Sequence, residues 1–228
     1  MTDPARMAQA FDELAESYDD DHHDEIARAL LALVGTPADE DEIADVACGS
    51  GAAALAIART RSPGATPVLA VDLSAGMVAA GRARAVRLGC EHAIDWRIGP
   101  AVPLPVADAA LDLVVCASSL HFLGRPALSD WRRALRPGGR AGFTLPVASQ
   151  FRPSGPFAAL VAADLPLPRT AEEALALATA AGFVDVDTRV IAVGSRSVVL
   201  TVATNPAPLG QPSCGTPGGR RPASSPGC

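Results

Sequence analysis

The sequence predicts an α/β fold in which helices cover both faces of a mostly parallel sheet. Short apolar runs alternate with helical stretches along most of the chain, which is typical of parallel strands joined by helical crossovers. The last two apolar runs differ, because they lie too close together for a helix to connect them. At 228 residues the chain can bury one complete core of this kind, with little left for a second domain.

The first forty residues show helical rather than strand periodicity. Apolar side chains recur at three- and four-residue spacing from Phe11 to Tyr18 and again from Ile26 to Val34. The next residues, Gly35-Thr36-Pro37, are a helix stop signal. We therefore expect N-terminal helices over residues 1–40.

Seven strand-like runs follow these helices. The first five, expected to be parallel, are residues 43–47, 68–71, 94–98, 111–117 and 141–145. A helix over 170–181 precedes the last two runs, 184–193 and 198–204, whose connection is as short as Gly194-Ser195-Arg196. Strands this close should pair antiparallel. The predicted fold is a doubly wound, seven-stranded, mostly parallel sheet with an antiparallel C-terminal strand.

Composition and charge argue against several classes of protein. A net charge of −6 and a pI near 5.2 disfavour a nucleic-acid surface, which needs clustered Lys and Arg. No apolar run is long enough to span a bilayer, and the N-terminus lacks the build of a signal peptide. Five cysteines without a CxxC pair suggest neither disulfides nor zinc, so a cytoplasmic location is expected. The sequence leaves the oligomeric state open.

Two further segments are interpreted from composition. The run Asp19 to Glu25 holds both His and carboxylates, but adjacent residues rarely converge on one ion, so we expect a solvated charge run and no metal. Residues 205–228 are rich in Pro, Gly and Ser and offer almost nothing to bury. This predicts a disordered tail, or an atypical terminus.

A glycine-rich loop connects the first predicted strand to the next helix. Gly49 and Gly51 stand in a G-x-G-x-x-A pattern, and glycines permit a tight turn and close approach of the backbone to a ligand at the helix N-terminus. The pattern is shared with Rossmann-like dinucleotide-binding domains and is also compatible with a bare strand-to-helix turn. By itself it predicts a nucleoside ligand only weakly.

Asp45, just before this loop, discriminates between cofactors. A carboxylate there would repel a pyrophosphate, whereas it attracts the sulfonium and ammonium groups of S-adenosylmethionine. The other interpretation is a structural acid that caps the turn or a neighbouring helix. Asp72 ends the second predicted strand, where an acid can accept both ribose hydroxyls of either cofactor. Ser74 is expected to cap a helix over residues 75–88.

With these motifs in this order, the chain resembles the class I S-adenosylmethionine-dependent methyltransferases, in particular the ubiquinone/menaquinone-type small-molecule branch. The matching segments are 11–18, 45–51, 71–77, 104–108, 111–115 and 135–140. The resemblance implies helices over the active site at 1–40, a cofactor-binding domain at 41–204 and a methyl transfer by in-line displacement to O, N or C. It also implies cofactor contacts at Tyr18, Ala47, Leu73, Met77, Ala101 and Ser118, besides Asp45, Gly49, Gly51 and Asp72.

The chain departs from the family after the third predicted strand, where Pro100 replaces the acid that usually holds the adenine amino group. Losing such a hydrogen bond weakens binding by about 0.5–1.5 kcal/mol when water substitutes. The backbone N–H of Ala101 still reaches an adenine nitrogen in this interpretation. The departure is also compatible with a non-catalytic relative that keeps the fold. A nicotinamide-dependent oxidoreductase is a further alternative, but only the glycines and Asp72 support it.

His121 is the candidate general base, because it follows the carboxyl end of the fourth predicted strand, where sites of open α/β sheets form. A structural role for this histidine is the alternative. Ser118 either contacts the methionine part of the cofactor or caps the next helix, and Tyr18 either covers that part or packs the leading helix. Phe151 and Phe157 suit a small apolar or aromatic acceptor.

Overall fold

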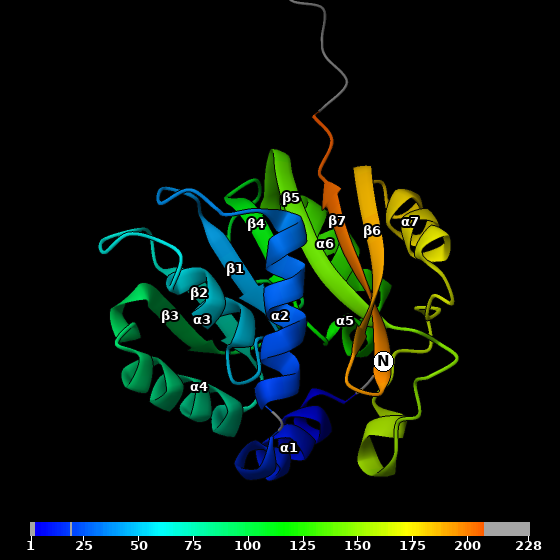
Figure 1. Cartoon of the computed structure of the whole chain (residues 1–228), viewed down its shortest axis with the longest axis horizontal. Helices are drawn as coiled ribbons and strands as arrows, with labels where there is room; N and C mark the ends of the chain where they lie inside the picture. The colour runs from blue at the N-terminus through cyan, green and yellow to red at the C-terminus, as the bar shows by residue number, and fades with distance from the viewer. Residues whose placement is uncertain (1–2, 19, 208–228) are drawn as a thin grey trace, which may run out of the picture.

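A computed structural model describes residues 3–18 and 20–207, and its centre is one seven-stranded sheet (Figure 1). The strands are β1 (Ile43–Val46), β2 (Val68–Asp72), β3 (Ile94–Ile98), β4 (Leu111–Cys116), β5 (Leu135–Pro146), β6 (Val184–Val193) and β7 (Arg196–Thr204). Their order is β3-β2-β1-β4-β5-β7-β6. The first five strands are parallel to one another and β7 is antiparallel to both β5 and β6, which confirms the predicted fold.

Helices cover both faces of the sheet. The helices are α1 (Pro4–Leu14), α2 (Asp20–Val34), α3 (Ala52–Ala58), α4 (Ala75–Leu88), α5 (Leu120–Leu123), α6 (Arg125–Ala134) and α7 (Ala171–Ala180). Short 3-10 helices are η1 (Ala15–Ser17), η2 (Glu91–Ala93) and η3 (Gly155–Ala159). Residues of α2, α3 and α4 bury one face, and residues of α5, α6 and α7 bury the other. Figure 1 shows α2 lying across the front of the sheet and α1 below it.

The two apolar clusters follow directly from the alternation of side chains along each strand. In β2, Val68 and Ala70 pack with α3 and α4, while Leu69 and Val71 belong to the opposite cluster. In β1 the same alternation sends Ile43 to the α3 side. Asp45 therefore points to the α3 side as well, which determines the role of its carboxylate.

Helix ends mostly follow the signals in the sequence. The hydroxyl of Ser74 accepts from the backbone N–H of Met77 at 3.0 Å, so Ser74 caps α4 as predicted. Thr170 caps α7 in the same way, accepting from the N–H of Glu173. Gly89 and Gly182 follow α4 and α7 with positive φ, the conformation in which glycine ends helices most readily.

The starts of two strands differ from the prediction. β5 begins at Leu135 rather than at residue 141, and β7 begins at Arg196 rather than at 198. The segment Arg136 to Gly139 is an irregularity within β5, where the register with β4 shifts between Leu111 and Leu113. Its backbone bonds come from Asn205, which accepts from Gly138 N–H at 2.8 Å and donates to the Gly139 carbonyl at 2.7 Å. A partner that is distant in the sequence thus holds this irregular segment in the sheet.

Asn205 also corrects the predicted start of the tail. It is 6% exposed, and its amide nitrogen donates to the carbonyls of Arg132 and Leu135 at 3.1 and 2.9 Å. The ordered chain therefore includes this residue, and residues 208–228 of the predicted tail lie outside the described residues. Within the described part, no helix combines the length and apolar character needed to cross a membrane.

Candidate active site

The candidate site lies at the carboxyl ends of β1, β2 and β4, where the strand order reverses between β1 and β4. Open α/β sheets bind ligands at this point, because the loops leave in opposite directions there. Two residues other than glycine have positive φ here, Ala47 at 51° after β1 and Ser118 at 71° after β4. The hydroxyl of Ser119 donates to the Ala47 carbonyl at 3.0 Å and joins the two loops. Backbone strain of this kind clusters at functional sites.

Asp72 is the acid best placed to hold a nucleoside. It is 8% exposed and lines a small cavity, together with Gly49, Ala47, Leu73 and Ala101. Its two carboxylate oxygens accept from the backbone N–H groups of Gly49 and Ser74, both at 2.8 Å. Burial raises the pKa of Asp72, and the bonds from Ser74 and Gly49 oppose that rise. Each oxygen retains acceptor capacity toward the cavity.

Asp45 lies behind the glycine loop rather than in the cavity. It is 1% exposed, and its carboxylate accepts from the backbone N–H of Ala54 in α3 at 2.8 Å. This is the helix-capping contact that the sequence left as an alternative. Burial raises the pKa of Asp45 to about 7, the Ala54 bond lowers it and the charge of Asp72 raises it further. Attraction of a cation by Asp45 would therefore act through the loop, without direct contact.

The two loop glycines have different surroundings. A Cβ on Gly49 would lie 3.5 Å from the hydroxyl oxygen of Tyr18, so the tyrosine covers the loop on the cavity side. A Cβ on Gly51 would lie within 2.3 Å of the Trp96 ring. Gly51 also has a φ of 81° and is N-terminal to α3. Packing and backbone conformation thus explain why position 51 is a glycine, and a cofactor contact there stays a prediction.

Some of the remaining predicted cofactor residues line the cavity and others do not. Ala101 and Leu73 line the cavity beside Asp72, as does Tyr18. Met77 is fully buried and does not line it. Pro100 is exposed at the end of β3, next to Ala101.

The N-terminal helix α1 covers this cavity from outside. Asp12 accepts from the Ser74 hydroxyl at 2.6 Å and from the Gly76 N–H at 2.8 Å, and these bonds lower the pKa of Asp12. Met7 and Phe11 of α1 line the cavity, whose volume is only about 30 Å³. This space holds about one water molecule. A space of this volume is too small for a nucleoside, so we expect the residues that cover Asp72 to move when one binds.

A larger cleft of about 340 Å³ adjoins this cavity and shares Phe11, Tyr18, Ser119 and Phe122 with it. Its floor contains His121 and Ser118, the two residues predicted near the transferred group. His121 is 6% exposed, and burial and the nearby His23 lower its pKa to about 4. The imidazole is therefore neutral at pH 7. Within the described residues, His121 Nδ1 and Ser118 Oγ are buried without a hydrogen-bond partner.

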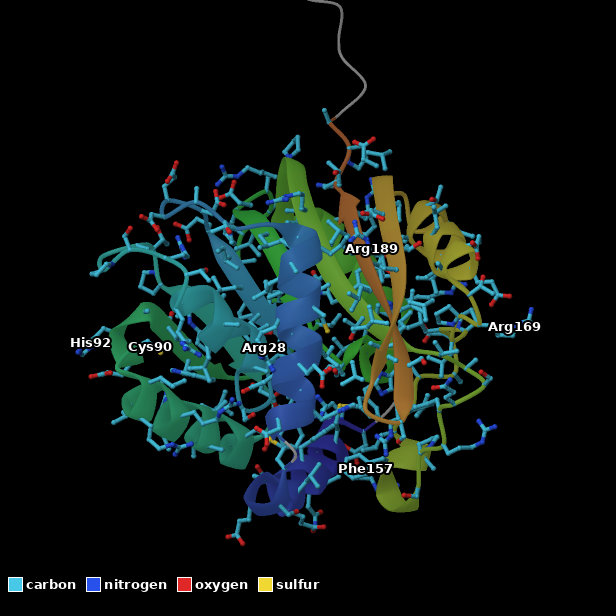
Figure 2. All side chains as sticks on the ribbon, viewed as in Figure 1. Arg28, Cys90, His92, Phe157, Arg169 and Arg189 are labelled. Carbon is cyan, nitrogen blue, oxygen red and sulfur yellow. The ribbon has the colours of Figure 1, made fainter. Side chains whose placement is uncertain are left out.

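The cleft walls include Phe151 and Phe157, which the sequence analysis proposed for the acceptor, and other residues that it did not single out. Four of the six phenylalanines of the chain line it: Phe11, Phe122, Phe151 and Phe157. The rings of Phe11 and Phe157 meet edge to face at 5.2 Å, and Figure 2 shows Phe157, a residue of η3, next to α1. Arg152 and Arg196 also line the cleft. No motif marks these arginines, because β7 and the loop after β5 meet only in the folded chain.

Behind the loop, a buried arginine connects three elements. Arg84 of α4 is 8% exposed and forms a 2.7 Å ion pair with Asp24 of α2. It also donates to the hydroxyl of Ser50 in the glycine loop at 3.0 Å. The glycine loop is thus held against both α2 and α4.

The comparisons with known proteins agree with this geometry. Residues 43–139 match the family described as "Methyltransferase domain". The chain is 37% identical over 101 residues to a ubiquinone/menaquinone biosynthesis C-methyltransferase of Geobacter sulfurreducens, which covers 43% of this chain and 39% of that one. It is 28% identical over 145 residues to a demethylmenaquinone methyltransferase of Clavibacter sepedonicus, with coverage of 60% and 56%. The chain thus spans about half or less of the length of these relatives.

Solved structures show the same fold. A SAM-dependent methyltransferase from Aquifex aeolicus aligns with a TM-score of 0.59 at 18% identity, and the alignment covers 90% of this chain and 99% of that one.

Proposed function

We propose that this chain is a class I S-adenosylmethionine-dependent methyltransferase, which transfers the methyl group of S-adenosylmethionine to a small-molecule acceptor. The observation that carries the proposal is Asp72. Its carboxylate is held by two backbone N–H groups at the strand-order reversal, and it faces a cavity that adjoins a second, larger cleft. One cavity for a nucleoside and one for an acceptor is the arrangement that a group transfer requires.

The residues of the smaller cavity fit the cofactor chemically. Asp72 would accept the ribose hydroxyls, Leu73 and Ala101 would flank the adenine, and Tyr18 would cover the methionine part over Gly49. When bound, S-adenosylmethionine supplies a methyl carbon already activated by its sulfonium. The protein then mainly has to align the acceptor and exclude water. The position of α1 over the cavity supports such exclusion once the cofactor has entered.

The floor of the larger cleft would orient the acceptor. Neutral His121 offers Nδ1, and Ser118 offers its hydroxyl, to a polar group of the acceptor. A base with a pKa near 4 removes protons weakly at pH 7, so His121 assists an acceptor that is itself acidic or merely needs positioning.

We also propose a reducing, cytoplasmic location, supported by three free cysteines within the described residues.

Calorimetry with S-adenosylmethionine, S-adenosylhomocysteine and NADH tests the cofactor. We expect saturable binding of the first two and none of NADH. Asp72→Asn keeps one acceptor oxygen and should weaken S-adenosylmethionine binding at least tenfold. Asp95 is an exposed acid on β3, and the control variant Asp95→Asn should leave this binding unchanged. A melting curve separates a folding defect from a binding defect. Binding of NADH alone, or an unchanged affinity in folded Asp72→Asn, would refute the proposal.

Incubation with labelled donor and a small-molecule extract tests catalysis. We expect label to appear in at least one small molecule. Cofactor binding with no transfer to any molecule would favour the non-catalytic alternative.

A further inference from the structure

We propose that the acceptor is an aromatic or similarly flat acid, whose anionic group binds Arg152 and Arg196 at the rim of the larger cleft. The inference rests on the proposed function and specifies its substrate class. Carboxylate and phosphate share the required chemistry, since both accept paired hydrogen bonds from guanidinium groups.

The charge of the cleft is opposite to that of the molecule. The chain carries a net charge of −6, yet none of the described residues that line this cleft is an aspartate or glutamate. Arg152 and Arg196 line it instead. An overall acidic protein repels anions at long range, so a local acid-free wall with two guanidinium groups selects for a negatively charged ligand.

The fold brings the two arginines to one rim. The carbonyl of Ser197, next to Arg196 at the β6–β7 turn, accepts from the N–H of Val147 at 3.1 Å. Val147 begins a turn whose carbonyl accepts from the N–H groups of Gln150 and Phe151, immediately before Arg152. The β6–β7 turn and the loop after β5 are therefore joined directly at the cleft.

Both guanidinium groups retain donors for a ligand. Arg152 donates only to main-chain carbonyls within the described part of the chain, those of Phe151 at 2.9 Å and Ala148 at 3.4 Å. Arg196 has neither an acid nor a carbonyl partner among the described residues, and both side chains belong to exposed residues. Other exposed arginines are paired with acids, as Arg169 is with Glu173 and Arg189 is with Asp187.

The walls define the body of the ligand. Four phenylalanine rings surround the cleft, and two of them, Phe122 and Phe151, also contact the imidazole of His121. Aromatic rings favour a flat apolar partner through stacked and edge-to-face contacts. At about 340 Å³ the cleft has the size of a small-molecule site.

Titration with three probes that share one ring system tests the inference. These are 2-naphthoate, 2-naphthyl phosphate and the neutral 2-naphthamide, each measured by calorimetry at low salt, with and without saturating S-adenosylhomocysteine. We expect at least one anion to bind ten times more tightly than the amide. This preference should shrink as salt rises, because exposed charges are screened. The two anions distinguish carboxylate from phosphate recognition.

The double variant Arg152→Gln/Arg196→Gln should lose the preference and bind the anion at least tenfold more weakly, with less than a twofold change for the amide. Arg169→Gln is the matched control, since Arg169 does not line the cleft, is paired with Glu173 and should change neither affinity. Anions that bind no better than the amide, or an unchanged anion affinity in the double variant, overturn the inference. Intact S-adenosylhomocysteine binding in the same samples would then leave the proposed function standing.

Discussion

Asp45 combines a structural contact with an electrostatic effect. Its carboxylate caps α3 at Ala54, and burial raises its pKa to about 7, so its charge changes within the physiological range. A bound cation stabilises the ionised form, since opposite charges attract more strongly where water is excluded. Cation affinity and the ionisation of Asp45 are therefore linked.

We predict that the affinity for S-adenosylmethionine rises by up to about tenfold between pH 6 and pH 8. The cationic donor binds the ionised form of Asp45 better, and the ionised fraction grows as pH passes through the pKa of about 7. Asp45→Asn keeps an oxygen for the Ala54 N–H but carries no charge, so its affinity should be nearly flat over this range. Calorimetry at pH 6, 7 and 8 measures both. An equally steep profile in Asp45→Asn would exclude Asp45 as the origin.

His121 illustrates how packing determines protonation. The aromatic rings of Phe122 and Phe151 lie 4.1 and 4.9 Å from its imidazole, between ring centroids. They withhold water from a side chain whose charged form needs it, which agrees with its pKa of about 4.

Replacing Phe151 by Ser should raise the pKa of His121 from about 4 toward its ordinary value of about 6.5, because water then reaches the imidazole. The histidine would become partly protonated near pH 6, where it is neutral in the parent protein. NMR titration of labelled histidine follows this directly, with His121→Gln to assign the signal. A midpoint that stays near 4 in Phe151→Ser would show that this ring is not what excludes water.

At the scale of elements, α1 controls access to the smaller cavity. It is attached to α4 through Asp12, whose carboxylate accepts from Ser74 and Gly76 at the helix N-terminus. Since the cavity beneath it has a volume of only about 30 Å³, we expect this attachment to open when the cofactor enters. The closed state then reduces the fraction of protein ready to bind.

Asp12→Ala should speed both association and dissociation of S-adenosylmethionine several-fold, because α1 loses the two bonds that hold it closed. Glu13→Ala is the control: this exposed neighbour bonds only Gln9 on the same helix within the described residues. Stopped-flow fluorescence in the two variants gives the rates. Equal association rates in Asp12→Ala and Glu13→Ala would mean that α1 does not limit entry.

At the scale of the whole molecule, Asn205 just after β7 connects segments that are far apart in the sequence. Asn205 connects β7 to the start of β5 and to the end of α6 through the carbonyls of Leu135 and Arg132. These contacts join residues about seventy positions apart and satisfy carbonyls that would otherwise be buried without a partner.

A chain that ends after Ala207 should unfold at the same denaturant concentration as the full chain, because the described residues up to this point contain both apolar clusters. A chain that ends after Thr204 should lose about 1–3 kcal/mol of stability, since buried carbonyls lose the Asn205 amide. Chemical denaturation of the three chains checks this. Full stability after removal of Asn205 would contradict it.

The sequence by itself determined what depends on local pattern. Alternating runs specified the strands and crossovers, Ser74 specified the start of α4, and the order of motifs placed Asp72 and the glycine loop at one edge of the sheet. These signals are readable because side-chain periodicity and helix capping act over a few residues. The short β6–β7 connection likewise required an antiparallel pair.

Only the tertiary structure decided where side chains from distant segments meet. Strand alternation turns Asp45 toward α3, and Trp96, forty-odd residues away, packs against Gly51. The basic rim exists because the β6–β7 turn meets the loop after β5, which no local spacing encodes. The shift of the His121 pKa to about 4 likewise arises from burial. Burial and long-range contact are properties of the folded chain, and the chemistry of this site depends on both.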